Sequence, residues 1–373
     1  MRKVRVLVVD DAAAVRRVVS EALASDPAIE VAGVAPTGRL ALAKLPQLSP
    51  DLVTLDVEMP GMSGLETLAE IRTYYPDLPV VMLSAHTEQG AAVTLEALSL
   101  GASDYLPKPV GMSGPEEARE YLREHLLPKV KALCAGKAGL AASPLVAIPA
   151  PRGPKPAPRV RPERIDVVGI GVSTGGPNAL AVVLSRLARD FPVPIVVVQH
   201  MPPVFTRLLA ERLSDSTPLR VREASPGGVL APGTVWLARG DYHLVVARDD
   251  KRLQVSLSQG PRENSCRPSV DVLFHSLADV FGARTLAVVL TGMGRDGLRG
   301  CQEIRDAGGQ VIVQDEATSV VWGMPGFVAN AGLAQAVLPL QEVAGEIERR
   351  AWTRRSRTIA AMSASGVDGA SGE

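Results

Sequence analysis

The sequence has 373 residues, enough for two domains that each bury their own core. Lys and Arg together number 40, as do Asp and Glu, and this zero net charge argues against a protein that binds nucleic acid or an anionic membrane. Apolar runs stay well below about 20 residues, so we expect no direct membrane insertion. Three widely spaced cysteines fit neither a disulfide framework nor a metal knuckle, which favours a cytoplasmic protein.

The chain divides at a stretch with seven prolines between Pro144 and Pro162. Such a stretch cannot continue a helix or a sheet, and we expect a semi-rigid linker there. After Trp352 the sequence becomes rich in Arg and then in Ser, Gly and Ala, without apolar periodicity, which predicts a disordered tail. The expected parts are a first domain (1–135), the linker (136–162), a second domain (163–350) and the tail (351–373).

Short apolar strands alternate with helical patterns through the first domain. The predicted strands are Val4–Val9, Ile29–Ala35, Leu52–Leu55, Val80–Leu83 and Asp104–Leu106. Ser113 and Glu116 form a capping-box pair before the last helical pattern. This alternation predicts an α/β fold with a doubly wound, flavodoxin-like parallel sheet, whose functional residues lie at the carboxyl ends of the strands.

Chemically distinctive residues follow four of these strands. Asp10 and Asp11 end the first strand, Asp56 the third and Ser84 the fourth, and Lys108 follows the fifth. Three carboxylates at one edge repel one another unless a cation compensates, and Mg²⁺ is the natural occupant of an all-oxygen site. Asp56 would then be a nucleophile that accepts a phosphoryl group. Taken alone, the first two aspartates would be a helix N-cap pair.

The first domain resembles the response-regulator receiver family over about residues 3–125. The motifs that carry the resemblance are Val9-Asp10-Asp11, the run from Leu55 to Pro60, Gly64, Ser84-Ala85, Tyr105 and Lys108-Pro109. It implies that Asp56 is phosphorylated by a histidine kinase and that a cis peptide precedes Pro109. The implied Mg²⁺ ligands are Asp10, Asp11, Asp56 and the backbone carbonyl of Glu58. Ser84 and Lys108 would stabilise the phosphoryl oxygens, with Tyr105 as the aromatic partner of Ser84.

Three apolar runs in the second domain each lead to a residue type used in hydrolysis. The runs are Val167–Gly171, Pro194–Val198 and Leu286–Leu290, and they lead to Ser173, His200 and Asp296. If the strands are parallel, as in a Rossmann-like sheet, these side chains meet at one edge. A serine hydroxyl needs an imidazole to remove its proton, and the imidazole needs a carboxylate to fix its tautomer. The glycines around Ser173 and the following Pro177 predict a sharp turn whose backbone N–H groups could form an oxyanion hole.

Each of these signals has an alternative interpretation. The glycines of Gly169-x-Gly171 could cradle a dinucleotide phosphate, but no acidic residue ends the next strand. His243 and His275 are rival bases, although His275 falls inside a helical pattern. The run Gly171-Val172-Ser173-Thr174-Gly175 also fits the nucleophile elbow of α/β-hydrolases, whose triads follow the order Ser, Asp, His rather than the order found here.

The second domain is similar to the catalytic domain of protein-glutamate methylesterases over about residues 165–350. The motifs are the run from Gly169 to Pro177, Gln199-His200-Met201-Pro202, the run from Leu290 to Gly297 and Gly323-Met324-Pro325. The resemblance implies a nucleophile at Ser173, a general base at His200 and its orienting partner at Asp296, with Thr174 and Met293 near the site. It implies no cofactor for ester hydrolysis, and it extends to deamidation of receptor glutamines. The implied partners are methyl-accepting chemoreceptors as substrate and the chemotaxis histidine kinase as phosphodonor.

Two other functions compete with a regulated hydrolase. A receiver could control a transcription factor, but that requires a helix-turn-helix with a basic face, whereas the second domain alternates strands and helices. A non-catalytic adaptor with an inactive hydrolase domain is the other possibility, and against it stands the presence of all three candidate catalytic residues.

Overall fold

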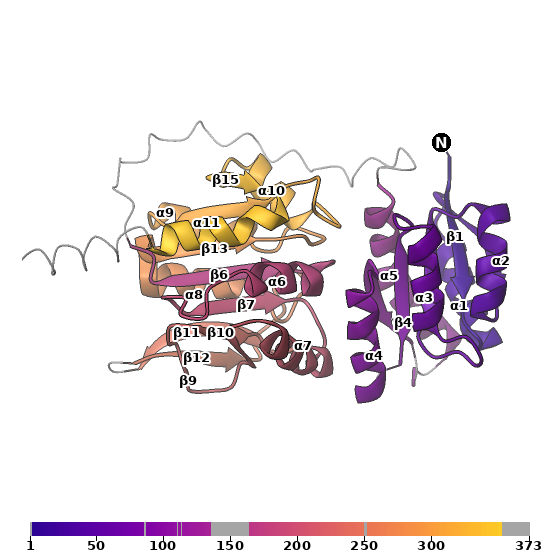
Figure 1. Ribbon diagram of the computed structural model, residues 1–373, viewed down its shortest axis with the longest axis horizontal. Helices are drawn as coiled ribbons and strands as arrows, with labels where there is room; N and C mark the ends of the chain where they lie inside the picture. Colours follow the sequence, from indigo (N-terminus) through magenta and orange to yellow (C-terminus); the bar gives the residue numbers. More distant parts are fainter. Residues whose placement is uncertain are drawn as a thin grey trace, which may run out of the picture. The chain divides into compact units, whose positions relative to one another are not determined.

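The computed structural model describes residues 2–85, 87–109, 111–112, 114–135, 164–249 and 252–352. The chain divides into two compact units, Met1–Pro151 and Arg152–Glu373, and each is described by itself (Figure 1). The expected linker lies outside the described residues, as does the expected tail apart from its first two residues, which continue the last helix. Within the described ranges, no helix is long and apolar enough to cross a membrane.

The first unit contains a parallel five-stranded sheet in the order β2-β1-β3-β4-β5. Its strands are β1 (Val4–Val9), β2 (Ile29–Ala35), β3 (Leu52–Asp56), β4 (Val80–Ser84) and β5 (Asp104–Pro107). The five predicted strands are all present, and the last three each end one residue later than predicted. The chain therefore starts next to the edge of the sheet at β1, adds β2 on one side and then adds β3, β4 and β5 on the other. This places the acidic cluster at the switch point between β1 and β3.

The described part of the first unit also contains five helices. They are α1 (Ala13–Ala24), α2 (Gly38–Leu48), α3 (Gly64–Tyr74), α4 (Glu88–Ser99) and α5 (Pro115–Leu133). Apolar side chains of α1 and α5, among them Leu23 and Leu122, pack together over β1 and are fully buried. Ser113 lies outside the described residues, and the N-cap of α5 is Gly114, followed by a proline in the first turn.

The second unit contains a parallel seven-stranded sheet in the order β15-β14-β13-β6-β7-β10-β8. Its strands are β6 (Val167–Val172), β7 (Ile195–Gln199), β8 (Arg220–Glu223), β10 (Thr234–Leu237), β13 (Thr285–Val289), β14 (Gln310–Gln314) and β15 (Ala336–Leu338). The first strand, β6, lies in the middle, and the chain builds outward from it on one side and then on the other. This arrangement is the doubly wound, Rossmann-like sheet predicted from the sequence.

A small antiparallel sheet, which the sequence did not predict, interrupts this alternation. It consists of β9 (Gly228–Val229), β11 (His243–Asp249) and β12 (Arg252–Ser258), in the order β11-β12-β9. Its buried face meets the helix that follows it in the chain, because Leu244 and Val246 of β11 belong to the same core as that helix.

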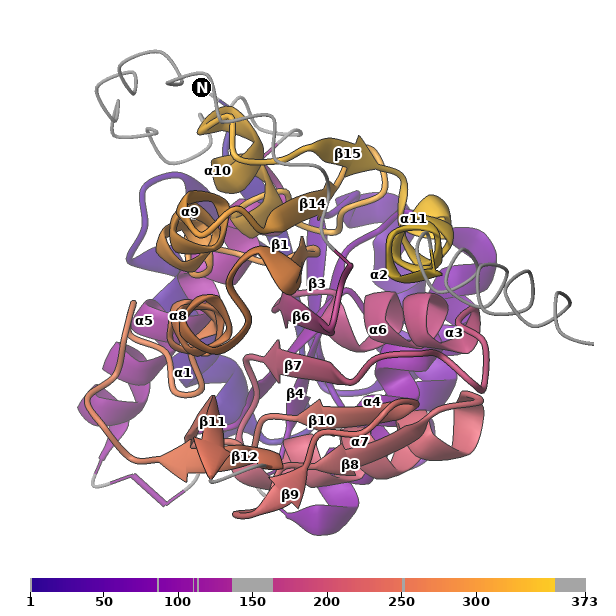
Figure 2. The ribbon, with the colours of Figure 1, turned by 90° about the vertical axis from the view of Figure 1, so that its left-hand side faces the viewer.

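Helices cover both faces of the large sheet. They are α6 (Gly176–Ser185), α7 (Pro203–Ser216), α8 (Val270–Phe281), α9 (Leu298–Asp306), α10 (Met324–Asn330) and α11 (Leu340–Trp352). Figure 2 shows α8 and α9 on one face, and α6 and α11 on the other. The last helix runs two residues past the domain boundary expected at residue 350, and Ala351 is buried.

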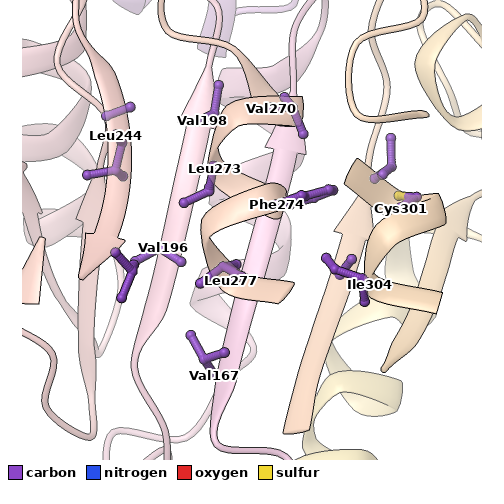
Figure 3. Close-up of a cluster of buried hydrophobic side chains, with 14 of the residues drawn as sticks. Val167, Val196, Val198, Leu244, Val270, Leu273, Phe274, Leu277, Cys301 and Ile304 are labelled. Carbon is purple, nitrogen blue, oxygen red and sulfur yellow. The ribbon is translucent and has the colours of Figure 1, made fainter. Parts of the chain in front are cut away.

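The glycines of β6 allow α8 to lie close against the sheet. Figure 3 shows Val270, Leu273, Phe274 and Leu277 of α8 in the core above Val167 and its neighbours. A Cβ added to Gly169 would lie 2.5 Å from the Leu277 side chain, and one added to Gly171 would lie 2.4 Å from the Val270 side chain. Both glycines lie within the strand, so their pattern reflects helix packing rather than a phosphate-binding loop.

Candidate active site

The sheet brings the ends of β6, β7 and β13 together. Val172 pairs with Gln199 on one side of β6, and Gly171 pairs with Val289 on the other. Because these strands are parallel, the residues after them emerge at the same edge, beside the switch point between β6 and β13. Ser173 follows β6, His200 follows β7, and Asp296 lies in the loop after β13.

Ser173 occupies a tight strand-to-helix turn. Its N–H donates to the carbonyl of Thr291 at 3.0 Å, and its own carbonyl accepts from the N–H of Gly176 at 2.8 Å. Gly175 has a φ of +76°, a left-handed conformation that favours glycine. The backbone of Gly292 approaches closely, because a Cβ added there would lie 2.9 Å from Cβ of Ser173. The turn is therefore held by the backbone of the loop after β13.

Gln199 ties the backbones of Ser173 and His200 together. Its Nε2 donates to the carbonyl of Ser173 at 2.9 Å and to that of His200 at 3.3 Å. Its Oε1 is buried, has no hydrogen-bond partner in the described parts of the chain and lies where a Cβ of Gly176 would be. The glycine at position 176 thus makes room for the side chain that links the two turns.

Asp296 is buried and accepts six hydrogen bonds. One comes from Nε2 of His200 at 2.8 Å. The other five donors are the side chains of Asn264 and Ser269 and the backbone N–H groups of Val270, Asp271 and Gly297. Three of these backbone and hydroxyl donors belong to the start of α8, so the carboxylate also caps that helix. This donor set fixes the carboxylate facing the imidazole.

The same contacts shift the pKa values of the pair. Burial alone would raise the pKa of Asp296, but the hydrogen bonds from His200, Val270 and Ser269 outweigh it and lower the pKa to about 2. Burial disfavours the charged form of His200, yet its hydrogen bond to Asp296 and its contact with Cys266 raise its pKa above the usual value. Asp296 is therefore the ionised acceptor, so Nε2 of His200 carries a hydrogen, and Nδ1 has the lone pair when the ring is neutral.

Ser173 Oγ makes no hydrogen bond to His200 in the part of the chain that the structure describes. Catalytic hydrogen bonds of this kind often form only when a substrate is bound. The backbones are nevertheless adjacent, since the N–H of His200 donates to the carbonyl of Val172 at 3.3 Å.

The rival histidines lie elsewhere or have other partners. His243 is buried, and its ring nitrogens face the carbonyl of Pro261 and the N–H of Ser269. His275 is exposed and pairs with Glu303 and Asp279 on the surface. Among the described residues, neither ring contacts Asp296.

Thr174 and Met293, expected near the site, flank Ser173 and its close neighbour Gly292. Thr174 is buried and its carbonyl accepts from the hydroxyl of Thr291 at 3.0 Å. In the loop after β13, as far as the described chain goes, the N–H groups of Met293 and Gly294 have no hydrogen-bond acceptor. Free N–H groups beside the serine turn are the type of donor that stabilises an oxyanion.

The acidic residues of the first unit also lie together. Asp10, Asp11 and Asp56 each place a carboxylate oxygen within 4.8 Å of the others. Lys108 Nζ contacts Asp10 at 2.9 Å and Asp56 at 2.7 Å. Burial is the main cause that raises the pKa of Asp56 to about 6, opposed by the contact with Lys108. Asp10 and Asp56 are buried and Asp11 is exposed, and three carboxylates this close together fit a hard divalent cation such as Mg²⁺.

The remaining residues expected to act in the receiver are Ser84 and Tyr105, together with the peptide before Pro109. The hydroxyl of Ser84 donates to the carbonyl of Gly90 at 3.0 Å, and Tyr105 is buried. The cis peptide bond of the described chain lies between Arg267 and Pro268, so the cis peptide expected before Pro109 is wrong. Ser84 would have to turn away from its backbone acceptor to reach a phosphoryl oxygen.

Sequence reasoning missed the loop that supports Asp296. Asn264, Cys266 and Ser269 all lie in it, and each contacts His200 or Asp296. The signal was the polar run from Glu263 to Ser269 directly before a strongly apolar helix. A run of this composition is also typical of an ordinary surface loop, so the pattern alone could not assign it to the site.

Both units match known families. Residues 6–119 match the response regulator receiver domain, and residues 168–347 match the CheB methylesterase. The fold and site thus define a receiver joined to a hydrolase of the methylesterase class. A relative from Trichodesmium erythraeum, named protein-glutamate methylesterase/protein-glutamine glutaminase, is 51% identical, and the match covers 94% of this chain and 99% of the relative. The chain belongs to the family of protein-glutamate methylesterases/protein-glutamine glutaminases.

The chain is also similar to a second relative and to a solved structure. A relative from Nocardioides sp. with the same name is 48% identical, with 97% of this chain and 99% of the relative covered. Among solved structures, the methylesterase catalytic domain of CheB from Thermotoga maritima is 41% identical with a TM-score of 0.49, covering 50% of this chain and 99% of that one.

Proposed function

We propose that the second unit hydrolyses the methyl esters of glutamate side chains on methyl-accepting chemoreceptors, through Ser173, His200 and Asp296. The observation that carries the proposal is the contact between His200 and a buried, fully hydrogen-bonded Asp296, beside the serine turn. An imidazole oriented by an ionised carboxylate is what a serine nucleophile requires.

In the first half of the reaction, Ser173 Oγ attacks the ester carbonyl while Nδ1 of His200 takes its proton. Asp296 stabilises the imidazolium through Nε2, and it remains ionised because its pKa is about 2. The N–H of Met293 is our candidate donor to the oxyanion. The proton on His200 then passes to the leaving methoxy oxygen, and methanol departs from the acyl-enzyme.

In the second half, His200 removes a proton from water, which attacks the acyl-enzyme. Ser173 recovers its proton from the imidazolium and a glutamate carboxylate is released. A glutamine amide would follow the same route, with ammonia in place of methanol. The glutaminase activity in the names of the relatives is therefore compatible with one triad.

For the first unit, we propose that Asp56 accepts a phosphoryl group from the chemotaxis histidine kinase. Asp10, Asp11, Asp56 and the carbonyl of Glu58 would hold Mg²⁺, which would neutralise charge on the phosphoryl oxygens. Lys108 already contacts two of these carboxylates and could transfer one contact to the phosphoryl group. Ser84 would supply a hydroxyl. Phosphorylation would then regulate the esterase.

The test of the esterase is methanol release from methylated receptor. Ser173→Ala should lower the rate by about 10⁶-fold, as expected when a triad loses its nucleophile. Ser216→Ala is the matched control, because Ser216 is exposed at the end of α7 and should keep full activity. Substantial turnover by Ser173→Ala, with the control unchanged, would reject the assignment.

A further inference from the structure

Cys266 lies against the catalytic base of the proposed mechanism. Its Sγ is 3.8 Å from Nδ1 of His200, the nitrogen that does not face Asp296. Both side chains are partly exposed, so small solutes can reach them. The ligand atoms of His200, Cys266 and Asp296 all lie within 4.8 Å of one another.

The separation of these two atoms suits a soft metal ion. Zn–N and Zn–S bonds of about 2.0 and 2.3 Å place the two ligand atoms about 3.5 Å apart at a tetrahedral angle. The observed 3.8 Å differs by a few tenths of an ångström, which a small side-chain rotation removes. Thiolate and imidazole together favour Zn²⁺ and its softer relatives over Mg²⁺.

The surroundings of His200 also resemble those of a metal ligand. A histidine that binds metal through one nitrogen usually donates the other N–H to a carboxylate, which orients the ring and raises its basicity. Asp296 already accepts from Nε2 at 2.8 Å, so in the neutral ring the lone pair is on Nδ1, the nitrogen that contacts Cys266. The ring therefore needs no reorientation to bind a cation there.

We propose that Nδ1 of His200 and Sγ of Cys266 form an inhibitory site for a soft divalent cation such as Zn²⁺. The cation takes the imidazole lone pair and displaces the thiol proton to solvent, with water completing its coordination. The inhibitory effect rests on the proposed function, because the blocked lone pair is the one that accepts the proton of Ser173. Mg²⁺ would instead bind the carboxylates of the first unit.

Metal binding is measured without catalysis, on the full chain carrying Ser173→Ala. Cd²⁺ is the probe, since a thiolate–Cd²⁺ charge-transfer band reports the cysteine directly, and equilibrium dialysis gives the affinity. Adding Cys266→Ser should abolish the band and weaken binding by more than about tenfold. Loss of a residue that only hydrogen-bonds to a metal ligand already costs about tenfold or more, and loss of the ligand itself should cost more than that. Adding His200→Ala should weaken binding comparably. Cys134→Ala is the control, because that buried thiol lies in the other unit.

Inhibition is then measured by methanol release with Zn²⁺, each variant relative to its own metal-free rate. The wild type and Cys134→Ala should be inhibited alike, and Cys266→Ser and Cys266→Ala should need at least about tenfold more Zn²⁺. Equal Cd²⁺ affinity with and without Cys266 would overturn the site. Cd²⁺ binding that depends on Cys266, together with a metal-free wild type that releases no methanol from methylated receptor, would keep the site and reject only the proposed function.

Discussion

Nε2 of His200 lies 2.8 Å from Oδ2 of Asp296, although 96 positions separate the two residues in the chain. The carboxylate is held by five further donors, three of them around the start of α8. The contact therefore depends on the packing of α8 against β6 as much as on the loop that carries Asp296. It fixes which imidazole nitrogen can act as a base, and this division of roles leads to unequal effects of substitution.

His200→Ala should cost nearly as much as loss of the nucleophile, about 10⁶-fold in kcat, because the serine then loses the base that takes its proton. Asp296→Asn should cost about 10⁴-fold, since it disturbs the tautomer but leaves the base. Methanol release under substrate saturation measures both. His275→Ala is the control, because that histidine is exposed on α8. An inactive His275→Ala beside an active His200→Ala would mean that the base is misassigned.

The pH dependence of kcat/KM should report the contact between Cys266 and His200. The base acts only when neutral, so activity rises with pH through the pKa of His200. Contacts with Asp296 and Cys266 raise that pKa, which moves the rise to higher pH than for an ordinary histidine. Cys266→Ser removes one raising contact and should move the rise to lower pH. A profile that stays in place, measured without metal, would show that the thiol does not influence the base.

Gln199→Met should lower kcat by about 10²-fold with little change in KM. The substitution keeps the length of the side chain but removes the donor that ties the backbones of Ser173 and His200. Misplacing catalytic groups by about 1 Å typically costs this much. Gln341→Met, at an exposed position of α11, is the control. An unchanged kcat in Gln199→Met would leave Gln199 without a positioning role.

Most of the candidate site could be predicted because its residues follow the ends of strands. Ser173, His200 and Asp296 follow apolar runs, and parallel pairing alone brings such residues to one edge. The loop with Asn264 could not be placed in this way. Its turn contains two non-glycine residues with positive φ, 51° for Asn264 and 62° for Ser265, and its contacts reach across about 30 residues to the loop of Asp296.

The antiparallel sheet was missed for a related reason. β9 has only two residues, too few for an alternating pattern to be visible. β11 and β12 pair with each other and pack on α8, so their pattern resembles that of any half-buried hairpin. Gly169 and Gly171 could suggest a nucleotide site for a similar reason. A glycine can make room either for a phosphate or for a packed helix, and the sequence does not show which of the two lies against it.

Asp56→Asn should stabilise the first unit at neutral pH in the absence of Mg²⁺. Burial raises the pKa of Asp56 to about 6, so the folded state binds this proton more tightly than the unfolded state. The stability that this group contributes is present below its unfolded pKa of about 3.9 and is lost as pH rises through about 6. At about pH 7.5 the gain should be at most about 3 kcal/mol, and it should shrink near about pH 5.

Thermal melting of the wild type and Asp56→Asn, at both pH values and with and without Mg²⁺, measures this difference. Mg²⁺ should stabilise the wild type and reduce the advantage of the variant, because a cation favours the ionised carboxylates. Asp77→Asn is the matched control, since Asp77 is exposed and lies outside the cluster. A wild type that Mg²⁺ leaves unchanged would argue against a cation site at Asp10, Asp11 and Asp56.

Phosphorylation should raise the esterase rate through Asp56. A small phosphodonor with Mg²⁺ should increase methanol release by the wild type and by Asp77→Asn, whereas Asp56→Asn should not respond. Lys108→Ala should respond only partly, because Lys108 contacts Asp56 and can bind a phosphoryl group attached to it. Chelation of Mg²⁺ should remove the response of the wild type without changing its basal rate, since the proposed esterase mechanism involves no Mg²⁺. A phosphodonor response that survives Asp56→Asn would mean that another residue is phosphorylated, and a basal rate that falls on chelation would mean that Mg²⁺ acts at the esterase itself.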